Sequence, residues 1–116
     1  MHELSVATAV LNTAVKHADG RRVTHVSVRV GALRQVVPAS LRFYWEIVAR
    51  DTVCEDARLD LTVVDARLRC ERCRREWTPS IPLFRCQDCG GAGRVAIVAG
   101  EELSVEYLEL KEPIHA

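Results

Sequence analysis

The sequence is short of aromatic residues, proline, glycine and net charge. Of its 116 residues, 5% are aromatic, ten are proline or glycine, and sixteen basic residues balance sixteen acidic ones. An apolar content of 48% excludes a disordered or low-complexity chain. The absence of net charge excludes a molecule-wide field that would attract nucleic acid or an anionic membrane. We therefore expect one soluble globular domain with room for only a small second unit.

The chain also lacks a long apolar run. The longest stretch near its start, LSVATAVLNTAV, contains polar residues, follows a glutamate rather than basic residues, and is too short to span a bilayer. We expect neither an export signal nor a membrane anchor. The predicted location is the cytoplasm, where closely spaced cysteines hold metal or carry out redox chemistry more often than they form structural disulfides.

Four of the five cysteines lie close together in the sequence. Two C-x-x-C pairs, Cys70 with Cys73 and Cys86 with Cys89, stand twelve residues apart. This is the spacing of a ribbon-type structural zinc site, in which two turns each present a pair of thiolates. Four thiolates at about 2.3 Å complete a tetrahedron and leave no position for a substrate. Two redox dithiols or two disulfides are the alternatives, but the low apolar content of the segment favours zinc as its source of folding energy.

Five segments show regular apolar spacing. Two have helical periodicity and predict amphipathic helices: residues 3–17 and 38–50. Three alternate apolar and polar residues, as strands with one buried face do: residues 23–31, 59–64 and 103–108. The fifth cysteine, Cys54, lies between the second helix and the second strand, and we predict that it is a small buried apolar residue.

The order of these elements predicts an α+β fold. Two amphipathic helices and three strands have only one core to share, so we expect a three-stranded sheet with two helices on one face, plus an inserted four-cysteine zinc-ribbon lobe. We assign residues 1–66 and 100–116 to the α+β domain and residues 67–99 to the inserted zinc-binding domain. The run VAIVAG fits either the last strand of the larger domain or the final strand of the insert.

The arginines are unevenly distributed. Seven of them fall between residues 67 and 94, against three acidic residues, so the insert is basic and the remainder of the chain is acidic. A zinc-ribbon module that binds nucleic acid or serves in transcription is therefore our alternative function. Between the cysteine pairs, Trp77 is the single aromatic residue expected to expose a face for base stacking, so we favour a protein partner of complementary charge.

The first two residues form a candidate metal site. The free amine of Met1, the backbone amide of His2 and the His2 imidazole follow one another, so their three nitrogens can chelate one metal ion. Fused chelate rings suit a planar nitrogen set, which is typical of Ni(II) or Cu(II), whereas zinc prefers a tetrahedron. The site requires that Met1 be retained, which we expect because His2 is not a small residue. By itself, a histidine near an N-terminus is more often simply solvated.

The whole chain resembles the HypA/HybF family of hydrogenase-maturation nickel chaperones. The resemblance rests on MHELS leading into an apolar helix, on VSVRVGALRQVVPASLRFYWE, on the inserted C-x-x-C pairs and on GEELSVEYLEL. It implies that Met1, His2 and Glu3 bind nickel. The histidine would be the indispensable ligand, the terminal amine and backbone nitrogens would complete the plane, and the glutamate would act on metal and partner binding.

The resemblance also implies the metals, the partners and the function. The family's zinc ligands match four positions: Cys70, Cys73, Cys86 and Cys89. We expect a carrier, not an enzyme, that holds Zn(II) as a structural ion and transports Ni(II) with a nickel-binding GTPase of the HypB type. The implied recipient is the large subunit of [NiFe]-hydrogenase and, in some organisms, the urease pathway with its accessory proteins. We expect a monomer or a weak homodimer.

The remaining histidines are expected to serve structure. Some family members carry histidines directly after the C-x-x-C pairs, thought to tune the zinc site, whereas this chain has Arg74 and Gly90 there. We therefore predict no histidine-dependent switching at the zinc. His17 is expected in the last turn of the first helix, where positive charge is favourable, His25 on the polar face of its strand, and His115 solvated in the tail.

Overall fold

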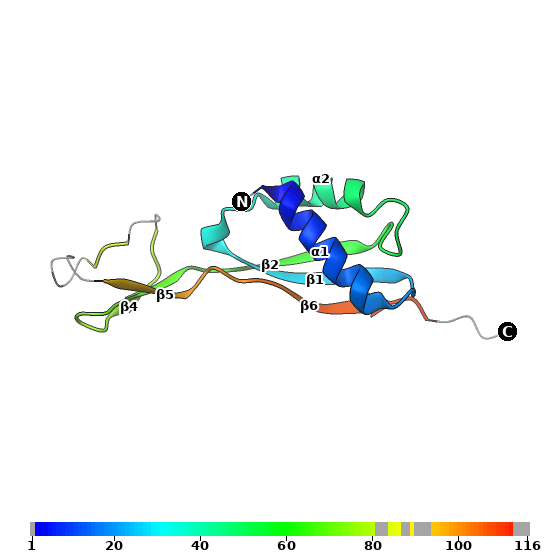
Figure 1. Ribbon diagram of the computed structural model, residues 1–116. Coiled ribbons are helices and arrows are strands. Elements are labelled where there is room, and N and C mark those ends of the chain that lie inside the picture. The colour runs from blue at the N-terminus through cyan, green and yellow to red at the C-terminus, as the bar shows by residue number, and fades with distance from the viewer. Residues whose placement is uncertain (1, 81–83, 87–88, 90–93, 113–116) are drawn as a thin grey trace.

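Figure 1 shows an elongated molecule, a computed structural model that describes residues 2–80, 84–86, 89 and 94–112 and measures 68 × 25 × 17 Å. It has two lobes, each containing a three-stranded sheet. The main lobe carries both α-helices and the ribbon lobe carries the paired cysteines. None of the described helices is long and apolar enough to cross a membrane.

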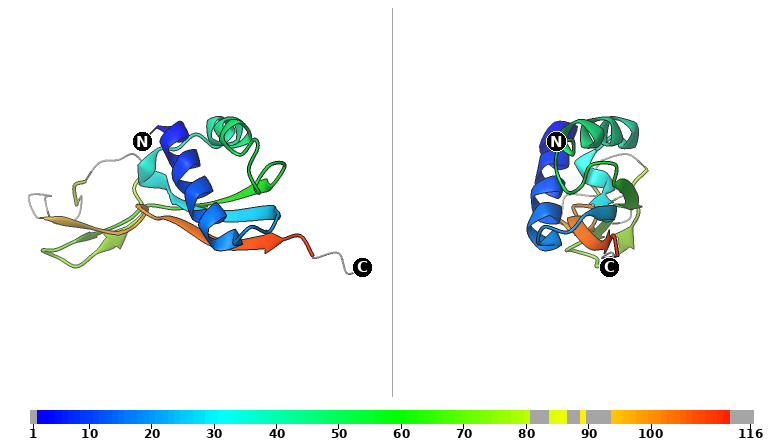
Figure 2. Two further views of the ribbon diagram at one scale, coloured as in Figure 1. Left: turned by 45° about the vertical axis from the view of Figure 1, so that its right-hand side comes forward. Right: turned by 90° about the vertical axis from the view of Figure 1, so that its right-hand side faces the viewer.

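The main lobe is built around one central strand. Its elements are α1 (Glu3–Ala18), β1 (Val23–Gly31), η1 (Ala32–Arg34), α2 (Pro38–Val48), β2 (Arg58–Val64) and β6 (Leu103–Leu110). The sheet has the order β2-β1-β6, with β2 parallel and β6 antiparallel to β1. The parallel pair is joined through η1 and α2, because a chain must cross over the sheet to lay the next strand in the same direction. Both helices cover one face of the sheet (Figure 2), which confirms the predicted α+β fold.

Local signals set the ends of the helices. The chain leaves α1 through Asp19, whose φ of 51° is left-handed, and Gly20, at a φ of 80°. Pro38 lies in the first turn of α2, where its missing N–H costs no hydrogen bond. The helix ends at Val48, two residues before the predicted Arg50. Between these ends, each helix packs its apolar residues against the rest of the main lobe.

The core lies between the helices and the sheet. Its most deeply buried residues come from both helices, the central strand and the α2–β2 connection: Val6, Ala7, Ala14, Val26, Val28, Leu41 and Cys54. The burial of Cys54 confirms its prediction as a small apolar residue. Trp45 is also buried, and its indole N–H donates to the Ala57 carbonyl at 3.0 Å, so the polar atom of the ring is satisfied.

The opposite face of the sheet is polar. His25 lies on it as predicted, and its Nδ1 is 2.9 Å from a carboxylate oxygen of Glu109 on β6. Cross-strand pairs of opposite charge contribute about 0.2–1 kcal/mol each. Ser27 also lies on this face, but it is only 8% exposed. In the strand register Ser27 stands opposite Tyr107, and the register shifts between Ser27 and Val28, so regular alternation is interrupted at this point.

The ribbon lobe has its own small sheet. It contains β3 (Arg67–Cys70), β4 (Glu76–Trp77) and β5 (Val95–Ala99), in the order β4-β3-β5 and antiparallel throughout. The VAIVA stretch pairs with β3 and so is a strand of the insert, which decides between the two placements that the sequence left open.

The lobes meet at a crossing of two backbones. Residues 65–66 and 100–102 carry the chain from one sheet to the other. Gly31 approaches them so closely that a Cβ on it would lie 2.0 Å from the carbonyl oxygen of Gly100. Gly100 has a φ of 114°, and a Cβ on it would lie 2.7 Å from the Ala66 Cα. Only glycine fits at both positions.

Hydrogen bonds fasten this crossing. The Gly31 N–H donates to the Glu102 carbonyl at 2.7 Å, and the Leu33 N–H donates to the Gly100 carbonyl at 2.9 Å. The Arg34 guanidinium donates to the carbonyls of residues 101 and 102 at 2.6 and 3.2 Å. The Gly100 N–H donates to the Glu102 carboxylate at 2.6 Å and lowers the pKa of that group. The end of β1 and η1 therefore hold the connection between the lobes in place.

Replacing Gly31 with alanine is expected to lower the free energy of unfolding by about 3 kcal/mol, because the added methyl group would overlap backbone atoms. Gly20→Ala is the matched control, since no atom lies within 4 Å of a Cβ there and only the positive φ of 80° opposes the change. That strain costs about 1 kcal/mol. Urea unfolding followed by circular dichroism measures both losses, and equal losses would contradict close packing at the crossing.

Candidate metal sites

The first cysteine pair lies in the turn between β3 and β4. Cys70 is the last residue of β3. Its N–H donates to the Arg75 carbonyl and its own carbonyl accepts from the Arg74 N–H, both at 2.8 Å. Arg74 has a left-handed φ of 66°, which lets the chain reverse within five residues. This tight turn brings the sulfur atoms of Cys70 and Cys73 to the same side of the chain.

The second cysteine pair reaches the same place. The Sγ atoms of Cys70 and Cys89 lie 3.6 Å apart, as do those of Cys73 and Cys86, and all four lie within 4.8 Å of one another. A tetrahedron with metal–sulfur bonds of about 2.3 Å has edges of about 3.8 Å, so this spacing fits one four-coordinate ion. The shortest contacts run between the two C-x-x-C pairs, an arrangement that suits neither a redox dithiol nor a disulfide within each pair.

Hydrogen bonds and neighbouring sulfurs give the thiols different acidities. The Cys73 backbone N–H lowers the pKa of Cys70 to about 7. The Arg75 N–H lowers the pKa of Cys73, but burial and the other sulfur atoms outweigh it and raise that pKa to about 11. Cys70 is therefore partly a thiolate at neutral pH, whereas Cys73 gives up its proton only when a metal ion replaces it.

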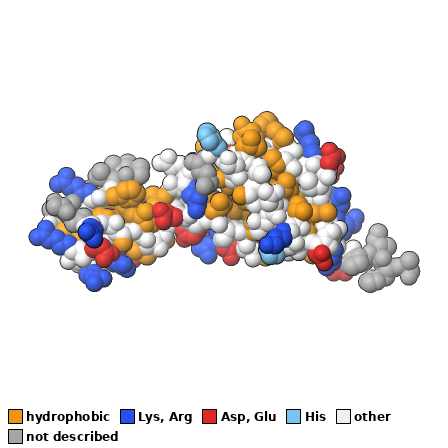
Figure 3. Space-filling view, in the orientation of Figure 1, with side chains coloured by type: hydrophobic (Ala, Val, Ile, Leu, Met, Phe, Trp, Pro, Cys, Tyr) orange, Lys and Arg blue, Asp and Glu red, His pale blue; other side chains and the backbone are white. Residues whose placement is uncertain are grey.

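The arginines of the ribbon lobe are partly neutralised by its own carboxylates. Figure 3 shows Lys and Arg side chains gathered on this lobe. Arg67 pairs with Glu76 at 2.8 Å and Arg69 pairs with Glu71 at 3.4 Å. Both pairs are solvent-exposed, so each adds little stability, but each removes one free cation from the surface. Part of the positive charge that suggested nucleic-acid binding is therefore paired with carboxylates of the same lobe.

The predicted nickel ligands fall at the start of α1, although Met1 lies outside the described residues. His2 is the N-cap, with extended backbone and an exposed side chain, and Glu3 is the first helical residue. The His2 carbonyl accepts the first helical hydrogen bond from the Val6 N–H at 3.1 Å. No hydrogen bond or ion pair with another described residue occupies either side chain. Both are therefore available to a metal ion.

The helix terminus also prepares the backbone for metal binding. The first N–H groups of a helix have no partner within it, so the His2 amide is free to exchange its proton for a metal ion. The positive end of the helix dipole favours the negatively charged nitrogen that results. Glu3 adds a carboxylate in the same first turn. The described part of the predicted donor set is therefore the His2 amide and imidazole, with the Glu3 carboxylate beside them.

Two residues of α2 lie beside this terminus. Ser40 and Tyr44 line a hollow of about 450 Å³ together with residues 2–5 of the chain. Tyr44 is half-buried on α2, and nothing in the sequence linked it to His2. The link is tertiary, because it follows from the two helices sharing one face of the sheet.

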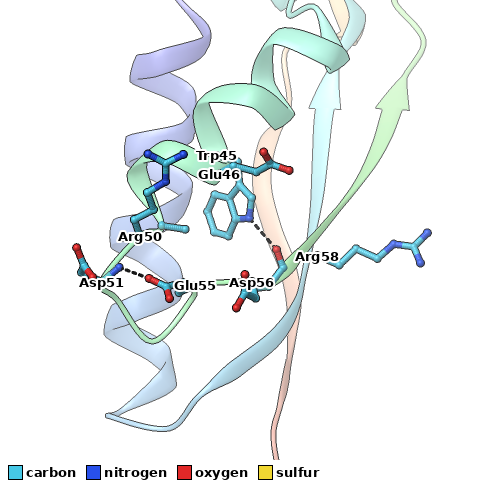
Figure 4. A pocket seen from close by; sticks show the side chains of 9 residues that line it. Trp45, Glu46, Arg50, Asp51, Glu55, Asp56 and Arg58 are labelled. Carbon is cyan, nitrogen blue, oxygen red and sulfur yellow. Dashed lines mark hydrogen bonds between the residues drawn. The ribbon is translucent and has the colours of Figure 1, made fainter.

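A wider hollow, of about 710 Å³, lies at the other end of α2 (Figure 4). Trp45 and charged side chains of both signs surround it. The Asp51 N–H donates to the Glu55 carboxylate at 2.6 Å, and the indole N–H is bonded to the Ala57 carbonyl. These bonds shape the α2–β2 connection. The residues lining the hollow include no serine, threonine, cysteine, histidine or lysine.

Comparison with known proteins places the chain in a family. A family model described as "Hydrogenase/urease nickel incorporation, metallochaperone, hypA" matches residues 1–110, which include all the predicted nickel and zinc ligands. The chain belongs to the HypA family. HypA proteins are metallochaperones and maturation factors, not enzymes, and the expected class of function is confirmed.

Individual HypA relatives align over nearly the full chain. A hydrogenase maturation factor HypA from Geotalea uraniireducens is 40% identical over 111 residues, which are 96% of this chain and 100% of that protein. The HypA of Streptomyces avermitilis is 42% identical over 110 residues, covering 90% of this chain and 83% of that one. The solution structure of the Ni metallochaperone HypA from Helicobacter pylori is similar at a TM-score of 0.69 and 25% identity, over 95% of this chain and 97% of that one.

Two other histidines of this HypA chain, His17 and His25, lie apart from His2 and from the cysteine cluster. His17 is exposed in the last turn of α1, as predicted, and His25 is paired with Glu109 on the open face of the sheet. Gly90 and His115 lie outside the described residues. Arg74 occupies the position after the first C-x-x-C pair, so the absence of histidine-dependent switching stays a prediction.

Cys73→Ser is expected to remove the metal ion from the ribbon lobe, because a hydroxyl cannot replace the fourth thiolate at neutral pH. Cys54→Ser is the matched control. It changes a cysteine in the main core and should leave the metal content unchanged, at a cost of about 1–3 kcal/mol for the buried hydroxyl. Elemental analysis of the natively purified proteins measures the metal per chain. Full metal content in Cys73→Ser would exclude the four-sulfur site.

Proposed function

We propose that this HypA chain binds Ni(II) through Met1, His2 and Glu3 and delivers it for maturation of [NiFe]-hydrogenase. The observation that carries the proposal is the position of His2 at the N-cap of α1, exposed and without a side-chain partner among the described residues, next to a backbone amide that the helix leaves free. Membership of a nickel-incorporation family makes nickel the ion to expect at such a nitrogen set.

Delivery proceeds by ligand exchange. A planar set of nitrogens leaves both faces of the ion open, so a partner's donor atom can bind before the imidazole leaves. Reprotonation of the backbone amide aids release of the ion, because the metal and the proton compete for the amide nitrogen. An exposed chain end suits this exchange better than the closed cage of four sulfurs does.

Zinc is the ion we assign to the ribbon lobe, held by Cys70, Cys73, Cys86 and Cys89. Support comes from the sulfur spacing and from the few apolar residues that the lobe buries, which leave the metal as its main source of folding energy. Residues 67–99 then form a zinc domain inserted into a nickel domain of residues 1–66 and 100–116. Closely spaced cysteines that hold a metal ion are typical of a reducing compartment, so we also assign the protein to the cytoplasm.

The proposed partners follow from nickel delivery. They are a nickel-binding GTPase of the HypB type and, as recipient, the large subunit of [NiFe]-hydrogenase. The family description names urease beside hydrogenase, so urease accessory proteins are recipients where the cell makes that enzyme. Nucleic-acid binding by the basic ribbon lobe remains the alternative, and salt-dependent binding to DNA or RNA would reveal it.

His2→Ala is expected to abolish stoichiometric nickel binding in equilibrium dialysis while zinc stays near one per chain, because only the imidazole closes the second chelate ring. His17→Ala is the matched control, since it removes an exposed histidine from the same helix. A two-residue N-terminal extension should act like His2→Ala by removing the free amine from its place beside His2. Nickel binding at unchanged affinity in His2→Ala would overturn the assignment.

Zinc affinity is expected to fall on acidification, and more steeply below about pH 7. Above pH 7 the metal ion must displace the proton on Cys73, whose pKa is about 11, so each pH unit of acidification lowers the affinity at least about tenfold. Below pH 7 the ion must also displace the proton on Cys70, whose pKa is about 7, so each pH unit lowers the affinity by a further factor of about ten. Competition with a chelator from pH 6 to pH 8 measures the slope, and a pH-independent affinity would contradict thiol ligation.

A further inference from the structure

Beside His2 the main lobe exposes large apolar side chains. Phe43 is 58% exposed, Leu4 47% and Ile47 40%. Phe43 and Ile47 stand one turn apart on α2 and therefore share a face of the helix. Figure 3 shows hydrophobic side chains gathered over α2. Single exposed apolar residues are ordinary, whereas contiguous groups of them mark interaction sites.

These side chains connect to the nickel end of the chain. The Phe43 ring packs edge-on against Tyr44, with centroids 5.3 Å apart and an interplanar angle of 76°. Tyr44 in turn lines the 450 Å³ hollow with His2 and Leu4. Leu4, Phe43, Tyr44 and Ile47 thus form one surface, the α2 patch, that begins at the proposed metal ligand.

We propose that the α2 patch is the docking surface for the protein with which His2 exchanges nickel. The inference rests on the proposed function. In ligand exchange the incoming donor atom must reach bonding distance of the ion while His2 still holds it, so the partner must cover the surface around His2. The apolar part of that surface is the α2 patch, and its burial supplies the affinity that a single transient metal bond does not.

The surface also indicates the chemistry of the partner segment. The hollow between His2 and Tyr44 admits a large apolar side chain. Arg42 and Glu46 flank Phe43 on α2, are exposed, and form no ion pair with another described residue. An apolar centre with a rim of both charges fits an amphipathic segment that inserts an apolar anchor and presents both charges at its edge.

A second copy of this chain is the less suitable occupant. Two copies joined through the α2 patch by a two-fold axis would bring both N-termini into the same interface. Each copy would then shield the open coordination faces of the other's nickel. Such a dimer stores the ion instead of passing it on, so we assign the patch to the exchange partner.

The experiment measures binding of the nickel-loaded full chain to its nickel-binding HypB-type GTPase by calorimetry. Phe43→Ser and Ile47→Ser are expected to weaken this binding about tenfold or more, as truncation of buried interface anchors does, with nickel stoichiometry unchanged. Val15→Ser is the matched control: Val15 is as exposed as Ile47 and also on a helix, but roughly 20 Å along α1 from His2. It should bind as the unaltered chain does.

The other outcomes separate this inference from the proposed function. Patch variants that bind the GTPase normally would overturn the docking surface and leave nickel delivery intact. Loss of nickel from the variants would place the patch in the metal site and overturn a docking role. Loss of self-association in sedimentation, with GTPase binding unchanged, would assign the patch to a second copy. An unaltered chain that does not bind the GTPase would overturn both the proposed partner and the patch assignment.

Discussion

The parallel pairing of β1 with β2 is the constraint on which the rest of the molecule depends. Because β6 runs antiparallel to both, the ends of β1 and β2 and the start of β6 lie at one edge of the sheet. The insert between β2 and β6 must leave from that edge. Since α1 leads into β1 and packs against it in the opposite direction, the start of α1 lies at the same edge, as Figure 1 shows. One pairing direction therefore brings the proposed nickel end to the side of the main lobe from which the ribbon lobe extends.

The two lobes are stabilised by different forces. The main lobe buries apolar side chains from two helices and the sheet, and burial of this kind contributes about 25 cal/mol per Å². In the ribbon lobe Leu68 and two of the cysteines are among the few fully buried side chains. We propose that its order comes from the metal ion and from the crossing at Gly31 and Gly100, where the two backbones approach closely. Main-chain contacts at this crossing, together with the hydrogen bonds of the Arg34 side chain, hold the connection to the ribbon lobe in place.

Much of the main lobe could be predicted from the sequence because each element has one buried face, which leaves a period of 3.6 or 2 in the apolar residues. The ends were less certain: β6 continues to Leu110, beyond the predicted residue 108. The direction of the β1–β2 pair was not predicted, since it depends on contacts across the lobe. Strands β3 and β4 were missed because they are only four and two residues long and show no periodic apolar pattern that would have marked them. The cysteine cluster was predictable because its spacing is local, whereas the neighbourhood of His2 and Tyr44 arises only when the helices pack.

The contrast between the metal sites explains why an apolar surface belongs beside one of them. Four sulfurs within 4.8 Å enclose an ion on all sides, and such a site needs no partner and offers no route for exchange. A nitrogen set at a chain end leaves the ion open, and an open site gives up its cargo to any competing donor unless approach is selective. The proposed α2 patch, with Phe43 and Ile47, would supply that selectivity, because small chelators gain nothing from it and a complementary protein does. In this proposal one fold separates a closed structural ion from an open transported one, and α2, beside His2, selects the molecules that reach the second.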